Sequence, residues 1–201
     1  MNRIALFAIT AAMIAGGAQA QTINNGQQNN ANIRAKLNAT VSSVVEDVNL
    51  TSAAIGNSIT VEGNTANTIN NTQRFFGDVS SELNARVSDV GKKVDVTSAA
   101  IANTASIKAD WAGTVNNVQY ANYDPTAVLN ATISAVGADV SATAAAISNT
   151  ATIEAGIGVV NSNQVNQAAV NALANTTISD VAGSVSATAA SIGNTLSVKG
   201  F

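Results

Sequence analysis

Hydrophobic and polar residues alternate through the stretch from Val48 to Glu62, and the alternation changes phase once. One set of like positions is Val48, Leu50, Ser52 and Ala54, and after a shift of one residue the next set is Ile55, Asn57, Ile59 and Val61. Side chains of an extended strand point alternately to its two faces, so a period of two predicts a strand. The stretch is therefore expected to form two strands joined by a corner.

A competing pattern precedes this stretch. From Leu37, apolar residues fall at Val41, Val44 and Val48, a spacing typical of an amphipathic helix. Val, Thr, Ile, Ser and Asn fill these segments, and β-branched residues favour strands over helices. Strands are the favoured interpretation, while the Ala-rich sequence SATAAAI at 141–147 keeps an α-helical or mixed repeat stack open as the alternative.

The same stretch occurs four times, each time as part of a longer repeat, and we call these repeats copies one to four. These copies span residues 22–67, 68–113, 114–158 and 159–201 and begin 46, 46 and 45 residues apart. Four columns of equivalent residues are identical throughout: the Asn57 column (Asn57, Asn103, Asn149, Asn194), the Thr51 column (Thr51, Thr97, Thr143, Thr188), the Gln27 column (Gln27, Gln73, Gln119, Gln164) and the Asn38 column (Asn38, Asn84, Asn130, Asn175). Identity in every copy indicates a structural task that each copy repeats.

One copy with short strands cannot bury its inner face alone, whereas stacked copies cover one another. The sequence therefore predicts a single all-β domain at 21–201, a β-solenoid in which each copy makes about two turns of about 23 residues, about eight turns in all. Inward amides of the Asn57 and Gln27 columns are expected to hydrogen-bond the equivalent amides above and below. The Thr51 column is expected to form a similar ladder through its hydroxyls.

Charged residues at equivalent positions alternate in sign from copy to copy. The clearest case, the Glu62 column, reads Glu62, Lys108, Glu154 and Lys199. Shorter columns read Asp47, Lys93, Asp139, then Glu46, Lys92, and then Lys36, Glu82. Opposite charges attract where neighbouring strands place them face to face, so the pattern indicates that the copies stack in register. Each exposed pair contributes only about 0.2–1 kcal/mol.

The first 20 residues differ from the repeats. Arg3 precedes an apolar run at 4–14, and the small residues Ala18 and Ala20 end the segment. This pattern predicts a secretory signal peptide at 1–20 with cleavage before Gln21. The apolar run is too short to span a bilayer permanently, and no later segment is apolar enough, so the mature chain is expected to be exported and to lack a transmembrane segment.

Composition argues against several classes of function. The chain has no His and no Cys, and its net charge of −3 comes without a basic cluster. It therefore lacks the commonest general base and transition-metal ligands, and it has no patch suited to nucleic acid. Its carboxylates have no partner at motif spacing, and it contains no phosphate-binding glycine loop and no calcium-binding repeat. We expect no enzyme activity, cofactor or metal site.

The few aromatic residues gather in the variable segments of the middle copies. They are Phe75, Phe76, Trp111, Tyr120 and Tyr123. Such a group forms either a small satellite core beneath the loops or an exposed contact patch for a partner, and the sequence leaves both interpretations open.

Short sequences in the repeats resemble bacterial surface proteins. GQQNNA at 26–31 resembles the Gly-x-x-Asn-x-Ala core of curlin-type surface fibres, and SAAIGNS and ATAAAISNT are similar to Ala/Asn/Thr-rich surface proteins of stalked, holdfast-forming bacteria. The resemblance implies a secreted repeat protein at the surface of a Gram-negative-type cell, with a role in adhesion and biofilm formation.

The leading hypothesis is a secreted structural or adhesive protein that polymerises head-to-tail into an extracellular fibre. The repeats run from near the expected cleavage site to the last residue, so we expect uncapped strand edges at both ends, with Glu62 and Lys199 meeting at the subunit junction. Expected partners are further copies of the chain, with outer-membrane secretion or nucleator proteins as candidates. The alternative is a monomeric adhesin-like or lectin-like binding module that uses the aromatic loops.

Overall fold

In the part of the chain that the structure describes, the regular structure consists of β-strands only. The computed structural model describes residues 21–200, so the expected signal peptide at 1–20 lies outside the described residues. The strands are β1 (Thr22–Asn29), β2 (Ile33–Val44), β3 (Val48–Phe75), β4 (Val79–Val90), β5 (Val94–Ala121), β6 (Pro125–Val136), β7 (Val140–Asn166), β8 (Asn171–Val181) and β9 (Val185–Gly200). The all-β class is confirmed, and the absence of any helix within 21–200 contradicts the helical alternative.

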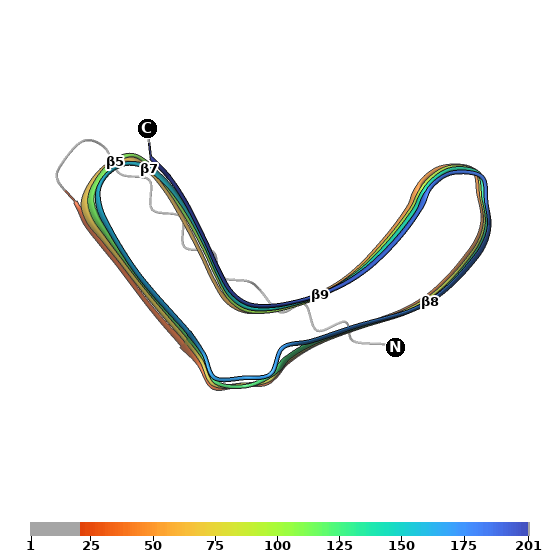
Figure 1. The fold of residues 1–201 in the computed structure, drawn as a ribbon, viewed down its shortest axis with the longest axis horizontal. Helices are drawn as coiled ribbons and strands as arrows, with labels where there is room; N and C mark the ends of the chain where they lie inside the picture. The colour runs from red at the N-terminus through yellow and green to blue at the C-terminus, as the bar shows by residue number, and fades with distance from the viewer. Residues whose placement is uncertain (1–20, 201) are drawn as a thin grey trace, which may run out of the picture.

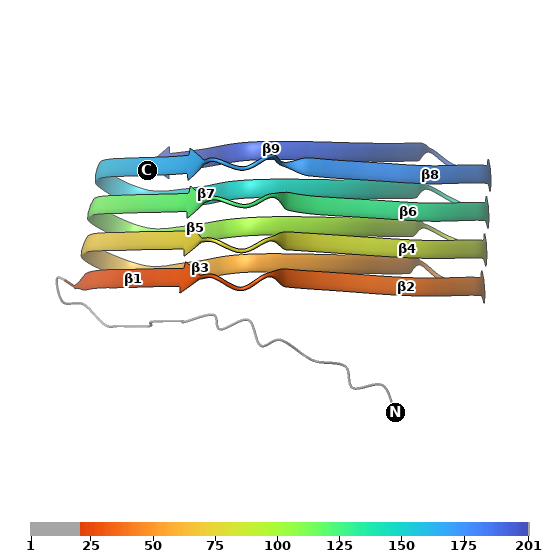
Figure 2. The ribbon, with the colours of Figure 1, turned by 90° about the horizontal axis from the view of Figure 1, so that it is seen from below.

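The strands form two parallel sheets. One has the order β1-β3-β5-β7-β9 and the other β2-β4-β6-β8. Each strand pairs with the equivalent strand of the next copy: Thr22 lies beside Thr68, and Thr68 beside Thr114. Figure 2 shows the copies as stacked levels. Because neighbouring strands are 46 residues apart along the chain, the interpretation of two turns of about 23 residues per copy is wrong. One copy makes one circuit.

The circuit is flat and bent into a shallow V. Figure 1 shows the copies overlying one another, with β9 on the concave side of the outline and β8 on the convex side. The strands β3, β5 and β7 are long because each follows the concave side, rounds one end of the outline and returns. Thus the second half of β3 (68–75) lies beside β1.

Inner side chains fill the space between the two walls of each circuit. Apolar residues form one cluster in each arm of the V and one between them, the last including Ala54, Phe75 and Ala102. Most inner positions carry Val, Ile, Leu or Ala, as expected for parallel strands with a covered face. Stacking thus supplies the core that a single copy lacks.

The change of phase in the alternation occurs at Gly56. A Cβ atom there would lie 2.4 Å from the carbonyl oxygen of Ala102 and 2.5 Å from the ring of Phe75, so only glycine fits. Ala54 and Asn57 on either side are both buried, and Ile55 takes the outer side. The irregularity bends the wall and brings Asn57 back to the inner side, as a bulge does.

Candidate functional site

The Asn57 column forms a continuous ladder of hydrogen bonds through the bend of the core. Nδ2 of Asn57 donates to Oδ1 of Asn103 at 2.8 Å, and the two further steps are 2.7 Å each. The second hydrogen of each Nδ2 goes to a backbone carbonyl, as from Asn57 to Arg74 at 3.0 Å. Asn57 is 5% exposed and Asn103 and Asn149 are fully buried. The ladder therefore satisfies amides whose burial without partners would be costly.

The Gln27 column forms a second inner ladder. Nε2 of Gln73 donates to Oε1 of Gln27 at 3.1 Å, and the further steps are 2.8 and 2.7 Å. Each Nε2 also donates to a carbonyl of the facing wall, as from Gln27 to Ser58 at 2.9 Å. These bonds join the two walls of one circuit as well as successive circuits.

The Thr51 column lies in register but faces outward. In β5, Thr97 is half-buried while Val96 and Ser98 on either side are fully buried. Thr51 and Thr188 are exposed. No hydrogen bond joins two members of this column within residues 21–200, so the expected inner hydroxyl ladder is contradicted. Alternate residues of a strand face opposite sides, and the threonines occupy the outer set.

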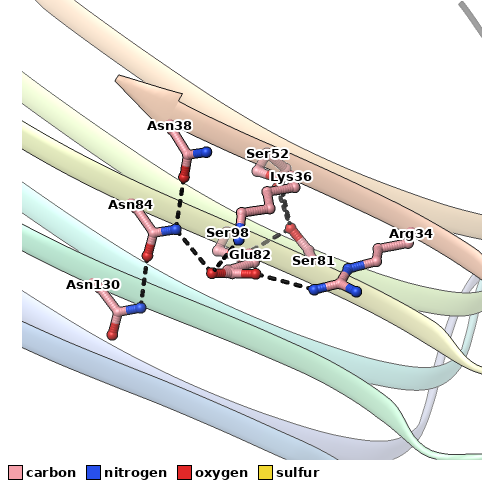
Figure 3. A network of polar contacts seen from close by, with 9 residues as sticks. All are labelled: Arg34, Lys36, Asn38, Ser52, Ser81, Glu82, Asn84, Ser98 and Asn130. Atoms are coloured by element: carbon pink, nitrogen blue, oxygen red, sulfur yellow. Dashed lines mark hydrogen bonds and ion pairs between the residues drawn. The ribbon is translucent and has the colours of Figure 1, made fainter. Parts of the chain in front are cut away.

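Two further ladders lie on the outer surface, where the sequence predicts no ladder. The Asn38 column is joined by three bonds of 2.8, 2.8 and 2.9 Å, and Figure 3 shows its first three members in line. The Asn24 column (Asn24, Asn70, Asn116, Asn161) is joined by bonds of 2.7, 2.8 and 2.9 Å. Asparagine at the equivalent position of all four copies is the sequence signal for both.

Glu82 lies beside the Asn38 column at the centre of a charged network (Figure 3). It accepts hydrogen bonds from Asn84 Nδ2 at 2.8 Å, Lys36 Nζ at 3.0 Å and Arg34 at 3.2 Å. These donors, Asn84 foremost, lower the pKa of Glu82 from 4.5 to about 2. The carboxylate is therefore ionised at neutral pH and can only accept hydrogen bonds, which requires the nitrogen of the Asn84 amide to face it.

The members of the Glu62 column lie side by side in adjacent strands. Glu62 pairs in register with Lys108, Lys108 with Glu154, and Glu154 with Lys199. Nζ of Lys199 lies 2.7 Å from Oε1 of Glu154. This hydrogen bond is the main reason why the pKa of Lys199 is raised and the pKa of Glu154 is lowered.

The shorter charged columns also meet in register, with one exception in their pairing. Lys36 forms an ion pair with Glu82, and Lys92 with Glu46. Lys93, directly before β5, instead pairs with Asp95 in that strand at 2.9 Å, and its backbone nitrogen donates to Asp47.

Both ends of the stack have strand edges that are unpaired within residues 21–200. β1 and β2 are edge strands at one end, and the first half of β3 pairs on one side only. We call this end the copy-one face. The copy-four face consists of β8, β9 and the second half of β7. There the inner side chains Val185, Leu196 and Val198 are 52%, 45% and 47% exposed, while their equivalents in copies two and three are buried.

The aromatic residues do not form one patch. Phe75 is fully buried in the core. The rings of Phe76 and Tyr120 lie 5.5 Å apart at the corner after β3 and β5, and Tyr123, 47% exposed, follows β5 at that corner. Trp111 is also 47% exposed, but it precedes Tyr120 by a length of strand that spans about 30 Å. The structure therefore separates Phe75 and Trp111 from the other three.

The chemistry that these residues offer is hydrogen bonding and charge pairing. Within 21–200, no group of three or more His, Cys, Asp and Glu residues is placed to hold a metal ion. None of the described segments is a helix long and apolar enough to cross a membrane.

Comparison with known proteins gives one family. The model of the family described as holdfast attachment protein D matches the chain twice, over residues 7–154 and 64–200. The two matches end 46 residues apart, which is the distance between copies one and two. No curated protein and no solved structure matches the chain.

Proposed function

The chain belongs to the holdfast attachment protein D family, and from this premise we propose that it is a secreted structural protein that polymerises head-to-tail into an adhesive surface fibre. In this proposal residues 1–20 are a signal peptide, and the domain that follows is a β-solenoid of four repeats. The fibre lies at the surface of a Gram-negative-type cell. Copies of the chain are its main partners, outer-membrane secretion or nucleator proteins assist it, and no catalysis or cofactor is involved.

The observation that supports polymerisation is the register of the stack. Successive copies pair residue for residue in parallel, and both faces leave strands of the same pattern unpaired within residues 21–200. A second chain placed on the copy-four face would bring 22–29 beside 159–166 and 34–44 beside 171–181. Unpaired strand edges accept a further strand readily.

Side chains at such a junction would match those inside the chain. Val185, Leu196 and Val198 of the copy-four face occupy positions equivalent to Val48, Ile59 and Val61. A second chain would therefore cover half-exposed apolar side chains with apolar ones, which favours association. Lys199 would face Glu62 of the second chain and continue the alternation of charge.

Purified protein spanning residues 21–201 tests this proposal. Sedimentation and electron microscopy are expected to show unbranched fibres, and diffraction from aligned fibres should give a reflection near 4.8 Å along the fibre axis, the distance between paired strands. A protein that remains monomeric at high concentration, without fibres, would contradict polymerisation. Loss of surface attachment by cells that lack the gene, and its recovery on expression of the chain, would test adhesion separately.

A second candidate is a monomeric surface-binding module, which the aromatic corner favours. Phe76 and Tyr120 pack at 5.5 Å and Tyr123 is 47% exposed, as expected of a small contact site. Replacing Tyr120 and Tyr123 by Ala would abolish binding to the attachment surface if this candidate is correct. If the chain is instead a fibre subunit, the same variant should still polymerise. Trp111→Ala at the distant corner is the control.

A further inference from the structure

The amide ladders have a direction. In the Asn38 column every Nδ2 donates toward copy one, as from Asn84 to Asn38 at 2.8 Å. The Gln27 column runs the same way, whereas in the Asn57 column every Nδ2 donates toward copy four, as from Asn57 to Asn103 at 2.8 Å. A directed column of amides has an unused donor at one end and an unused acceptor at the other.

Neighbouring groups fix each direction. The carboxylate of Glu82 accepts from Asn84 Nδ2 at 2.8 Å (Figure 3), so the oxygen of that amide must face Asn130. In the Asn57 column, the carbonyl of Arg74 lies 3.0 Å from Asn57 Nδ2 and requires a nitrogen there. Backbone carbonyls hold the Gln27 column in the same manner. Rotating an amide to reverse a ladder would break these bonds.

The two faces consequently present complementary groups. On the copy-one face, within residues 21–200, the Asn38 amide nitrogen donates no hydrogen bond, Gln27 Nε2 uses one hydrogen only, and Asn57 Oδ1 accepts none. On the copy-four face, among the same residues, Asn175 Oδ1 and Gln164 Oε1 accept none, and Asn194 Nδ2 uses one hydrogen only. Each unused donor has an unused acceptor at the equivalent position of the other face.

We propose that each face recognises the opposite face of a second copy through these ladder ends, which act as the specificity determinants of the junction. This inference rests on the proposed function. Asn38 donates to Asn175 of the second copy and Gln27 to Gln164, while Asn57 accepts from Asn194. The fibre that results has one polarity.

Two faces of the same kind do not fit in this way. Turning one copy over reverses the direction of its strands and lays one arm of the V over the other (Figure 1). Equivalent columns then no longer coincide, so unused donors lie over unrelated groups. An unpaired polar group at a buried junction opposes association, which leaves opposite faces as the pairing that satisfies every ladder.

The variant Asn38→Asp tests the role of a ladder end. Its carboxylate still accepts from Asn84, so the fold of the single chain is retained, but it has no hydrogen to donate to Asn175 of the second copy. The critical concentration for assembly at pH 7 is expected to rise roughly tenfold. Below about pH 4 the aspartic acid is protonated and can donate again, so assembly should return toward that of the unmodified protein at the same pH.

The control is Asn49→Asp. The side chain of Asn49 is exposed on the same face and makes no hydrogen bond within residues 21–200, so this variant adds the same charge without changing a ladder. Its critical concentration should stay within about twofold of the unmodified value, without recovery in acid. If both variants assemble alike, the ladder ends do not determine specificity, and the inference is overturned while the fibre itself stands.

A cross-linking measurement tests the junction independently of fibre formation. Thr40 and Thr177 are exposed and two residues beyond Asn38 and Asn175, and the chain has no cysteine. Thr40→Cys with Thr177→Cys should give disulfide-linked oligomers on oxidation, because paired strands lie within disulfide distance. The mismatched pair Thr40→Cys with Ser197→Cys should give none. Without linked oligomers from the matched pair the inference fails, and without fibres the proposed function fails.

Discussion

Asn57 and Asn103 lie one above the other in the bend of the core, and Nδ2 of the first donates to Oδ1 of the second at 2.8 Å. The two residues are 46 positions apart, so the bond forms only when β3 and β5 pair in the correct register. A slip by one residue would turn every inner side chain outward, whereas a slip by two would keep the inner set inside and would separate only the amides. In a chain with many similar Ala- and Thr-rich segments, the buried amides therefore select one register among several that apolar packing alone would tolerate.

The first prediction concerns Asn103→Ala. This change removes the bonds of Asn103 to both ladder neighbours and to the carbonyl of Tyr120, and it leaves the buried Asn149 Oδ1 without a donor and one hydrogen of Asn57 Nδ2 without an acceptor. We expect the free energy of unfolding, measured by urea denaturation, to fall by about 2–4 kcal/mol, because unpaired buried polar groups cost about 1–3 kcal/mol each.

The matched control is Asn116→Ala in the outer Asn24 column. Asn116 also has two ladder bonds, but its side chain is only part-buried and water can replace its partners. Its effect should be about 1 kcal/mol or less. Equal losses for the two variants would show that burial does not determine the contribution of a ladder.

A second prediction compares two glycines. In Gly56→Ala the added Cβ would lie 2.4 Å from the carbonyl oxygen of Ala102, whereas at Gly26 no atom lies within 4 Å of an added Cβ. Overpacking costs about 1–3 kcal/mol, so Gly56→Ala should lower the melting temperature clearly. Gly26→Ala should leave it unchanged or raise it slightly, because alanine restricts the unfolded chain. A destabilised Gly26→Ala variant would indicate that β1 cannot accommodate a side chain at position 26.

The fold could be predicted from the sequence to the extent that it depends on the repeat. Identity of the columns gave the pairing distance of 46 residues, and alternation gave the strands. The interpretation of two turns per copy was wrong because the length of a circuit depends on which distant strands hydrogen-bond to each other. The local alternation of side chains does not show which strands pair. Similar sequence recurs every 46 residues and not every 23, so the repeat length was the better guide to the length of a circuit.

The candidate site could be predicted only in part, for reasons that differ between residues. The alternation around Leu50 and Ser52 already places Thr51 on the outer side, so an inner ladder of the Thr51 column is inconsistent with the strand pattern itself. Phe75 and Phe76 face opposite sides for the same reason. The direction of the Asn38 column depends on Glu82 in the neighbouring strand, a contact that the register creates and that no local sequence pattern encodes.

A third prediction follows from the pKa of Glu82. In the fold this pKa is about 2, below the ordinary value of 4.5, so the unfolded chain takes up the proton first as the pH falls. The stability that Glu82 contributes is complete above about pH 4.5 and is lost between 4.5 and 2. The melting temperature should decrease through this range.

The variant Glu82→Gln isolates this contribution. It should melt at a lower temperature than the unmodified protein at pH 7, and its dependence on pH between 4.5 and 2 should be weaker. Glu154→Gln provides the comparison, because the pKa of Glu154 is also lowered but its partner is Lys199 at the edge of the stack. If Glu82→Gln keeps the full pH dependence, other carboxylates are responsible.

The last prediction concerns charge at the junction. In Lys199→Glu the ion pair with Glu154, 2.7 Å long in the structure, is lost, and in the proposed fibre the new carboxylate faces Glu62 of the next chain. Exposed charges interact over a Debye length of about 30 Å at 0.01 M salt and about 3 Å at 1 M. The variant should therefore assemble more slowly than the unmodified protein at low salt, with a difference that shrinks at high salt, as followed by light scattering.

Combining Lys199→Glu with Glu62→Lys restores opposite charges across the junction while leaving like charges within each chain, so recovery of the low-salt rate would assign the effect to the junction. A double variant as slow as Lys199→Glu alone would assign it to the ion pair inside the chain and would remove Glu62 and Lys199 from the proposed junction.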